Sequence, residues 1–494
     1  MSITLVASPR TANHMPSPAL AALKPCVQNA GYSCYTIDLN IELYNELKQN
    51  HGVYGEVDNY FQTDFRYLSQ NILDLEPLTR MKYSLSDDAL KLYQQHLNKW
   101  ADHILNQNND WIGISLLSVN SVLYTIDLAE ILKNKSPDCK IVLGGPGVST
   151  FGIMGASNLG SFMVAIGLAD TYLAGEGEYN LIKILKGETN IVQKQIDNLD
   201  ILPYPDYSDF DFTKYSKKKG NSVAITGSRG CVRSCTFCDI QSAWKKYRYR
   251  SGTSIANEMV NHYQKYGSKE FYFTDSLING SLKAFEQFLD AMILAKKQGL
   301  IGDDIKWNGQ FICRPINQFK EPWFEKMSLA GADMLQIGVE SGSEAVMHNM
   351  GKKLSNDDID FTIGMLSKYK IQCDLLMIVG YPTETDEDFN MTLDLLERLS
   401  PYNEQGCIMG INLGKTMVVL PGSPIGENMS HWGIEYDDNN NWISTLNPGL
   451  TFKERVKRRV LAQEKCQELG YMIRWPLTTL RTLSENLKLN KETA

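Results

Sequence analysis

The sequence lacks the features of proteins that are inserted into a membrane or exported through one. No run approaches the ~18 consecutive apolar residues that a membrane-spanning helix needs. The first ten residues do not combine a basic segment with a long apolar one, so we do not expect a signal peptide. These absences predict a cytoplasmic protein with no membrane partner.

Positive charge is also in short supply. The chain has 49 Lys and Arg residues against 57 Asp and Glu residues, a formal net charge of -8. This balance provides no electrostatic attraction for a polyanion, so a nucleic acid partner is disfavoured. Hydrophobic residues make up 43% of the 494 residues and charged residues 21%, as in ordinary globular proteins. This length predicts about two to four domains.

A second C-x-x-C pair is absent as well. The chain has ten cysteines, and in a cytoplasmic protein they are expected to stay reduced. Seven of them show no ligand spacing and are expected to be small buried side chains: Cys26, Cys34, Cys139, Cys313, Cys373, Cys407 and Cys466. The other three, Cys231, Cys235 and Cys238, share one loop directly after the apolar run Val223–Thr226.

Three cysteines on one short loop indicate a metal site. Zinc loops usually combine two C-x-x-C pairs, or one pair with histidines, and no such partner pair follows here. A 4Fe-4S cluster normally takes four thiolates, so three would leave one iron open to another ligand. The spacing therefore favours a cluster with an open iron, and the alternatives are a zinc site or three unrelated thiols.

The N-terminal part of the sequence alternates short apolar runs with helix patterns. Such alternation predicts a parallel sheet whose ligands lie beyond the carboxyl ends of the strands. The expected strands are 3–7, 33–38, 111–116, 140–143 and a last one after Asp170. The segment Gly144–Gly147 does not match G-x-G-x-x-G and on local grounds is a tight turn. Leu199–Asp206, with two prolines, is expected to be a linker.

The central part is more regular. Six β/α units are expected, with strands at 223–226, 271–275, 307–311, 334–339, 375–379 and 417–420. Six units are too few for a closed eight-stranded barrel, so we expect a partial barrel with its chemistry at the carboxyl ends of the strands. Asp275, Arg314, Glu340 with Ser341, and Gly380 occupy those ends. Alone, each would be a surface or capping residue; together they predict one site.

The expected domains are therefore residues 1–198, a linker 199–220, the partial barrel 221–425 and a mostly helical extension 426–494. Helix patterns in the extension cover Phe452–Leu469 and Leu477–Leu489. Its basic stretch Lys453–Arg459 is expected to be a solvated helix face, and the alternative is a site for an anionic substrate.

The cysteine spacing, with Phe237 before the last cysteine, resembles the signature of the radical S-adenosylmethionine (SAM) enzymes. Further motifs resemble the branch of that family with an N-terminal cobalamin-binding domain: Ser228–Cys231, Thr274–Asp275, Ile337–Ser343, Met350–Lys352 and Val379–Thr385. Gly144–Pro146, Gly175–Glu178 and Leu202–Asp206 are similar too, so the resemblance covers residues 1–425. It implies an α/β fold with a Rossmann-like domain, a partial (β/α)6 barrel and a C-terminal extension.

The resemblance also implies roles for individual residues. Cys231, Cys235 and Cys238 would hold a 4Fe-4S cluster, and SAM on the open iron would be cleaved by an electron to a 5′-deoxyadenosyl radical. The residues implied to contact SAM are Phe237, Asp275, Ser276, Arg314, Glu340, Ser341 and Gly380, where Asp275 and Ser276 keep the family pattern only in part. For Arg314 the alternative is a structural ion pair. Gly144, Gly145 and Glu176 would belong to the cobalamin site, which replaces the local interpretation of a turn.

The N-terminal domain departs from its family in one respect. Many cobalamin domains carry D-x-H-x-x-G, whose histidine ligates cobalt, and this sequence has no such motif; His14 lies in a different context. We expect cobalamin to bind without a histidine ligand, and the alternative is a domain that has kept only the fold.

The function that the resemblance implies is cobalamin-dependent methylation of an unactivated carbon in a small molecule. A reductase, flavodoxin or ferredoxin would supply the electron. The alternatives are radical cyclisation, oxidation or rearrangement without methyl transfer, and, from another class, a non-catalytic protein that senses cobalamin or an iron–sulfur cluster. A methylthiotransferase is disfavoured because the N-terminal half has no second cysteine triplet.

Overall fold

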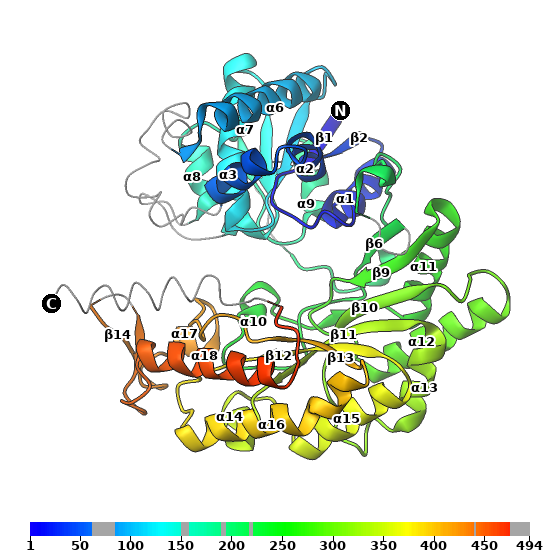
Figure 1. The fold of residues 1–494 in the computed structure, drawn as a ribbon. Coiled ribbons are helices and arrows are strands. Elements are labelled where there is room, and N and C mark those ends of the chain that lie inside the picture. The colour runs from blue at the N-terminus through cyan, green and yellow to red at the C-terminus, as the bar shows by residue number, and fades with distance from the viewer. Residues whose placement is uncertain (62–83, 150–157, 189–193, 217–220, 439–440, 475–494) are drawn as a thin grey trace. The chain divides into compact units, whose positions relative to one another are not determined.

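Two parallel sheets form the framework of the protein (Figure 1). The computed structural model describes residues 1–61, 84–149, 158–188, 194–216, 221–438 and 441–474. The chain divides into two compact units, residues 1–223 and 224–494. The predicted α/β fold is confirmed, whereas the predicted helix at 477–489 lies outside the described residues.

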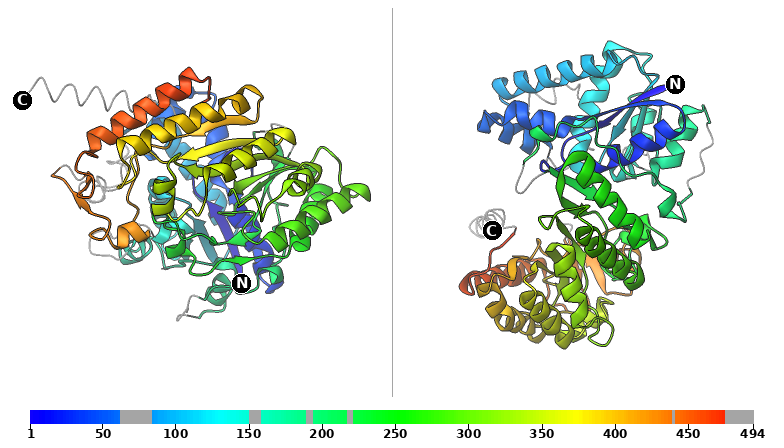
Figure 2. Two further views of the ribbon diagram at one scale, coloured as in Figure 1. Left: turned by 90° about the horizontal axis from the view of Figure 1, so that it is seen from below. Right: turned by 90° about the vertical axis from the view of Figure 1, so that its right-hand side faces the viewer.

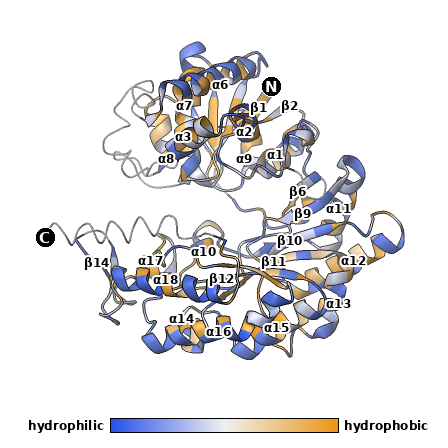
Figure 3. Cartoon of the chain, viewed as in Figure 1, coloured by the Kyte–Doolittle hydropathy of each residue, from blue (hydrophilic) through white to orange (hydrophobic). Residues whose placement is uncertain are grey.

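The first unit contains a five-stranded parallel sheet of order β2-β1-β3-β4-β5. Its strands are β1 (Ser2–Ala7), β2 (Ser33–Asp38), β3 (Trp111–Ser115), β4 (Ile141–Gly144) and β5 (Thr171–Tyr172). The apolar runs of the sequence form these strands because both faces of a parallel sheet are covered by helices. Figure 3 shows the hydrophobic colour along the middle of this sheet. The order reverses between β1 and β3, and in open α/β sheets ligands bind at such a switch point.

Seven described helices accompany this sheet: α1 (Pro18–Asn29), α2 (Leu39–Leu47), α3 (His51–Phe61), α6 (Asp87–Leu105), α7 (Val122–Lys135), α8 (Leu159–Ala165) and α9 (Gly177–Leu185). Helices α2, α3 and α6 lie in a stretch for which the sequence predicted no elements. Helix α6 shows why it forms: Ser86 caps it, and Leu90, Tyr93 and Leu97 recur at helical spacing and are buried.

The segment predicted to be a linker packs on the first unit. Lys24, only 3% exposed, pairs with Asp209 at 2.6 Å and with Asp206 at 3.8 Å. Asp209 also accepts from the backbone and hydroxyl of Thr36, each at 3.0 Å. These contacts attach residues 206–209 to α1 and β2.

The second unit is built on six strands in chain order: β6 (Asn221–Ile225), β9 (Ser268–Phe273), β10 (Lys306–Phe311), β11 (Ala332–Glu340), β12 (Gln372–Met377) and β13 (Ile408–Asn412). β6 and β13 are the two edges, so the barrel is partial, as predicted. Its outer helices are α11 (Gly252–Tyr266), α12 (Leu282–Lys297), α13 (Glu321–Ala330), α15 (Asn356–Lys368) and α16 (Asp386–Glu404) (Figures 1 and 2).

The predicted sixth strand at 417–420 is wrong, and Ile408–Asn412 takes its place beside β12. Burial does alternate in the predicted segment, with Met417 and Val419 buried and Val418 exposed. This alternation arises because the segment packs on a separate apolar cluster with Trp442, whose indole N–H donates to the Met417 carbonyl at 2.9 Å. Helix α11 is capped by Ser251, whose hydroxyl accepts from the Ser254 N–H.

The described residues of the C-terminal extension are 426–438 and 441–474. It contains the antiparallel pair β14 (Ile434–Tyr436) and β15 (Trp442–Ser444), and helix α18 (Phe452–Glu468). The prediction of a solvated basic face is wrong for three arginines of α18, because Arg455, Arg458 and Arg459 are at most 3% exposed. None of the helices in the described ranges combines the length and hydropathy that crossing a membrane requires.

Candidate functional site

The cysteine loop is closed at its base by a short two-stranded ribbon. β7 (Ser228–Arg229) pairs antiparallel with β8 (Arg248–Tyr249), so the residues between them leave the barrel and return at the same place. Gly230 begins the excursion at φ +85°, where a Cβ would lie 2.9 Å from the Lys246 carbonyl oxygen. Only glycine adopts this conformation in that space without strain.

The tip of the loop is docked on segments that follow the strands β11, β12 and β13. Thr236, between two of the cysteines, donates its N–H to the carbonyl of Met350 at 3.1 Å and accepts from the N–H of Ile425 at 3.0 Å. Its hydroxyl lies 2.9 Å from the hydroxyl of Tyr381. Phe237 packs on the apolar cluster that includes Met350 and Tyr381. The loop is therefore held by backbone and side-chain contacts of the two residues that follow Cys235.

The donor set of the loop fits an iron–sulfur cluster. Burial, against the lowering effect of Lys352, raises the pKa of Cys235 to about 11, and Glu340 and the neighbouring thiols Cys231 and Cys238 contribute to this rise. Burial likewise raises the pKa of Cys238. Three half-buried thiols close enough to repel one another as thiolates need a positive group between them, which the iron of a cluster would supply. Among the described residues, no three ligating side chains converge on a point that one metal ion could occupy. A cluster binds one thiolate per iron, so it does not require that convergence.

Asp275 and Ser276 follow β9, beside the first residue of the ribbon. The buried carboxylate of Asp275 accepts from the Gly227 N–H at 2.8 Å. Burial raises the pKa of this carboxyl to about 7, against the lowering effect of its hydrogen bonds to Ser228 and Gly227 and of Arg250 nearby. Ser276 is half-buried. Asp275 thus fixes the backbone just before the cysteine loop.

Arg314, predicted to pair with a carboxylate, contacts backbone carbonyls. Its Nη2 donates to the carbonyls of Asn279, at 2.5 Å, and Gly280, at 2.7 Å. Burial, and then the charge of Arg233 in the cysteine loop, lower its pKa. Arg314 therefore lies near that loop, but no acidic partner is recorded for it among the described residues, so the alternative of a structural ion pair is not supported.

Glu340 and Ser341 end β11 and are already engaged within the protein. The Glu340 carboxylate pairs with the ammonium of Lys352 at 2.8 Å, and both side chains are buried. Glu340 has φ +71° at a register shift of β11, a conformation that is strained for a residue with a side chain and is found most often at functional sites. The Ser341 hydroxyl lies 3.1 Å from that of Thr392 and accepts from the Ser343 N–H.

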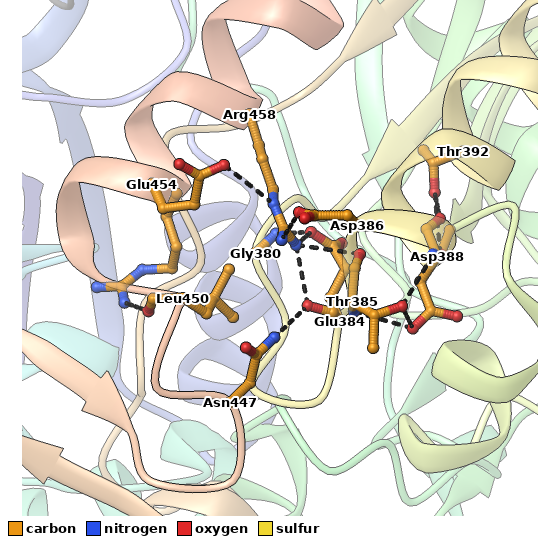
Figure 4. Close-up of polar contacts among 12 residues, drawn as sticks. Gly380, Glu384, Thr385, Asp386, Asp388, Thr392, Asn447, Leu450, Glu454 and Arg458 are labelled. Carbon is orange, nitrogen blue, oxygen red and sulfur yellow. Dashed lines mark hydrogen bonds and ion pairs between the residues drawn. The ribbon is translucent and has the colours of Figure 1, made fainter.

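Gly380 begins the turn after β12 and has φ +83°. A Cβ here would lie 2.7 Å from Cγ of Arg455, so the side chain of α18 covers the Cα directly. The Gly380 N–H donates to Oε1 of Glu384 at 3.1 Å, and the same carboxylate pairs with Arg458 at 2.9 Å (Figure 4). The close approach that requires glycine in this structure is therefore made by Arg455.

A family comparison identifies the domain that carries these residues. The model described as the radical SAM superfamily matches residues 225–396, which contain the three cysteines and the strand ends from β9 to β12. These residues form a radical SAM domain. The assignment made from the cysteine spacing is thereby confirmed.

Two curated relatives are methyltransferases by name. An uncharacterized methyltransferase of Pyrococcus horikoshii is 25% identical over 313 residues, which cover 59% of this chain and 64% of that protein. A bacteriochlorophyllide d C-12(1)-methyltransferase of Chlorobaculum tepidum is 25% identical over 222 residues, or 44% of this chain and 46% of that protein. The chain thus matches less than two thirds of the length of either relative.

The fold outside the radical SAM domain also has a counterpart. The radical SAM methyltransferase TsrM from Kitasatospora setae, solved with cobalamin and a [4Fe-4S] cluster bound, has a TM-score of 0.62 at 14% identity. The likeness covers 95% of this chain and 88% of TsrM. The chain therefore shares its fold with TsrM over nearly all its length.

Outside the radical SAM domain, the residues predicted for a cobalamin site lie at or after the ends of the neighbouring parallel strands β4 and β5. Gly144 ends β4 and Gly145 follows it; Gly145 has φ +91°, and a Cβ there would lie 2.3 Å from the Leu116 carbonyl oxygen. They therefore lie at the carboxyl edge of the sheet. The Glu176 carboxylate accepts from the N–H of Ile196, so it fastens a neighbouring segment of the chain.

The sequence did not single out three residues that the structure places around the radical SAM domain's cysteine loop: Thr236, Lys352 and Tyr381. Two of these residues lie in motifs that the sequence analysis had quoted. Lys352 closes the motif Met350–Lys352, and Tyr381 follows Gly380 in the motif Val379–Thr385. The contact of Tyr381 with Thr236, 145 positions earlier, could not be read from the local pattern.

Proposed function

We propose that the protein is a radical SAM enzyme that uses cobalamin to methylate an unactivated carbon of a small molecule. The observation that carries the proposal is the cysteine loop, docked at the carboxyl ends of a six-stranded partial barrel in a chain whose fold matches TsrM. The methyltransferase names of the curated relatives support the methyl-transfer part.

In this proposal Cys231, Cys235 and Cys238 hold the 4Fe-4S cluster. When bound, the cluster would supply the electron that cleaves SAM, and cobalamin would carry the methyl group. The buried pair Glu340–Lys352 presents a carboxylate and an ammonium next to Cys235, since both charges affect the pKa of that thiol. We assign Glu340 and Ser341 to SAM binding, together with Phe237, Asp275, Ser276, Arg314 and Gly380.

The first unit would bind cobalamin at the carboxyl edge of its sheet. Two observations fit the cofactor: the switch point between β1 and β3, and Gly145, whose missing side chain leaves the β4 turn tight against Leu116. Gly144 and Gly145 would line that edge, and Glu176 would hold residue 196 beside it. The cobalt would have no histidine ligand from a D-x-H-x-x-G motif.

The remaining parts of the proposal are a small-molecule substrate, an electron-donating reductase, flavodoxin or ferredoxin, and a cytoplasmic location. The domain boundaries at 198, 220 and 425 also stay predictions.

Anaerobic reconstitution tests the two halves separately. We expect the wild-type chain to take up iron and sulfide, and to form 5′-deoxyadenosine from SAM under reduction. The variants Cys231→Ala, Cys235→Ala and Cys238→Ala should do neither. Cobalamin uptake is followed by its absorption spectrum, and the substrate product by a mass increase of one methyl group.

Each result bears on a different claim. A chain that takes up no iron would contradict the whole proposal. SAM cleavage with products that carry no added methyl group would favour cyclisation, oxidation or rearrangement instead. Cluster and cobalamin uptake without any SAM cleavage would favour a sensing protein.

A further inference from the structure

The turn Gly380–Glu384, which follows β12, is held from one side by the C-terminal extension. The Ser444 hydroxyl donates to the Pro382 carbonyl at 2.9 Å, and the Asn447 amide donates to the Glu384 carbonyl at 2.7 Å. The turn has an internal bond from the Glu384 N–H to the Tyr381 carbonyl at 2.8 Å, and it also receives donors from residues about sixty positions later in the chain.

Arg458 of α18 makes the strongest of these contacts. Its Nη1 donates to the carboxylate and the carbonyl of Glu384, both at 2.9 Å, and its Nη2 pairs with Asp386 at 2.6 Å (Figure 4). The Arg458 and Glu384 side chains are 4% and 1% exposed. The stability of a buried charge pair depends strongly on its geometry, because a buried charge that loses its partner has neither water nor an opposite charge to stabilise it.

Glu384 also bonds to the backbone of the turn. Its Oε1, which receives Arg458, also accepts the N–H of Gly380 at 3.1 Å. One carboxylate oxygen therefore joins α18 to the first residue of the turn. Arg455, one helical turn before Arg458, lies on the Cα of Gly380 and stacks on Trp442 at 3.5 Å from the ring centre.

The other side of the same turn touches the cysteine loop. The hydroxyl of Tyr381 donates to the Asn349 carbonyl at 3.0 Å and lies 2.9 Å from the hydroxyl of Thr236. Thr236 separates Cys235 from Phe237. A continuous set of contacts thus leads from Arg458 through Glu384 and the turn to the loop that carries the three cysteines.

We propose that Arg458 is a positioning residue of the radical SAM site: through Glu384 it fixes the turn Gly380–Glu384, and with it Tyr381 and the cysteine loop. The inference rests on the proposed function, because it assumes that this turn lines the SAM site. It assigns to the C-terminal extension, which lies outside the matched superfamily domain, a part in binding SAM. Lysine would not replace Arg458, because it cannot reach two oxygens with a planar fork.

Three variants of the full chain test the inference: Arg458→Met, Arg458→Lys and the double variant Arg458→Met with Glu384→Gln. Arg458→Met strands the buried Glu384 carboxylate, whereas the double variant removes both charges and should recover thermal stability. We expect all three to raise the KM for SAM, on the order of tenfold or more for Arg458→Met, because the turn is no longer fixed. A merely structural role would lose the KM effect when stability recovers.

Hydrogen exchange gives a readout that does not depend on turnover. Loss of one buried hydrogen bond should speed amide exchange about tenfold in the peptide that spans 378–385, and the peptide that spans 234–240 should follow. The matched control is Arg459→Met, because Arg459 is equally buried on α18 but bonds to the Gly414 carbonyl and Gln463. This control variant should neither slow SAM cleavage nor speed amide exchange in the peptide 378–385.

The outcomes separate this inference from the function it rests on. Wild-type protein that does not cleave SAM would overturn the proposed function. Wild-type protein that cleaves SAM, with an unchanged KM in Arg458→Met, would overturn only the role of Arg458. Equal effects of Arg458→Met and Arg459→Met on exchange would also overturn it, since the contact to the turn would then be irrelevant.

Discussion

At the scale of single residues, Gly145 offers the sharpest test of the first unit. It has φ +91°, and a Cβ would meet the Leu116 carbonyl oxygen at 2.3 Å, whereas a Cβ on Gly144 would meet nothing within 4 Å. We expect Gly145→Ala to lower the free energy of unfolding by at least about 2 kcal/mol, and Gly144→Ala to change it little. Denaturant unfolding of both variants checks this. Similar losses in the two variants would contradict the structure of the β4 turn.

Asp275 predicts a pH dependence of stability. Burial raises the pKa of its carboxyl to about 7 in the folded protein, above the ordinary value of 3.8. The folded state then binds the proton more tightly, so the stabilisation by Asp275 is complete below pH 3.8 and is lost as the pH rises through about 7.

The variant Asp275→Asn isolates this effect because asparagine is neutral at every pH. Relative to wild type, its free energy of unfolding should rise between pH 4 and pH 7.5, by about 4 kcal/mol at most. Unfolding curves of both proteins at the two pH values measure the difference. A constant difference would show that the carboxyl titrates normally.

At the scale of elements, the ribbon β7–β8 governs the cysteine loop. Two guanidinium groups lie over the ring of Trp244, those of Arg229 at 5.8 Å and Arg248 at 5.4 Å from the ring centre. Each contact contributes about 0.5–1 kcal/mol. We expect Trp244→Ala to speed hydrogen exchange across 230–247 and to lower iron retention after reconstitution. The control Trp323→Ala, on α13, should leave both unchanged, since that ring stacks on Phe319.

The same scale shows what could be predicted from sequence. The cysteine loop and the strand ends Asp275, Glu340 and Gly380 were found because a short spacing or a regular β/α repeat marks them locally. The burial of Arg455 and Arg458 was missed, because their partners Trp442 and Glu384 are distant or lie on another element. A basic helix face looks identical in sequence whether water or a buried carboxylate faces it.

The sixth strand was misplaced for a related reason. Residues 417–420 alternate in burial as a strand does, yet the described ladder with β12 is made by Ile408–Asn412. That strand contains Gly410, where a Cβ would lie 2.7 Å from Nε of Arg474. The space beside this glycine is thus taken by a side chain 64 positions later, a contact that no local pattern in the sequence indicates.

At the scale of the whole molecule, the boundary of the first unit can be tested with two fragments. A fragment of residues 1–216 keeps Asp206 and Asp209, the partners of the buried Lys24, whereas a fragment of residues 1–198 leaves Lys24 without them. Removing one partner of a buried charge pair costs about 3–5 kcal/mol. We therefore expect the longer fragment to be more stable by about that amount, measured by thermal unfolding. Equal stability of the two fragments would show that residues 199–216 do not stabilise the first unit.

The order of contacts along the chain has a consequence for synthesis on the ribosome. The six strands of the second unit pair in chain order, so each can join the sheet as soon as it emerges. Asp374 and Glu384 are exceptions, because Arg474 pairs with the first at 2.7 Å and Arg458 with the second at 2.9 Å. Both carboxylates gain these partners only after the residues up to 474 and 458 have been synthesised. A chain that has not yet reached α18 can therefore build the barrel before it can hold the turn beside the cysteines, so the site is finished only after α18 has been synthesised.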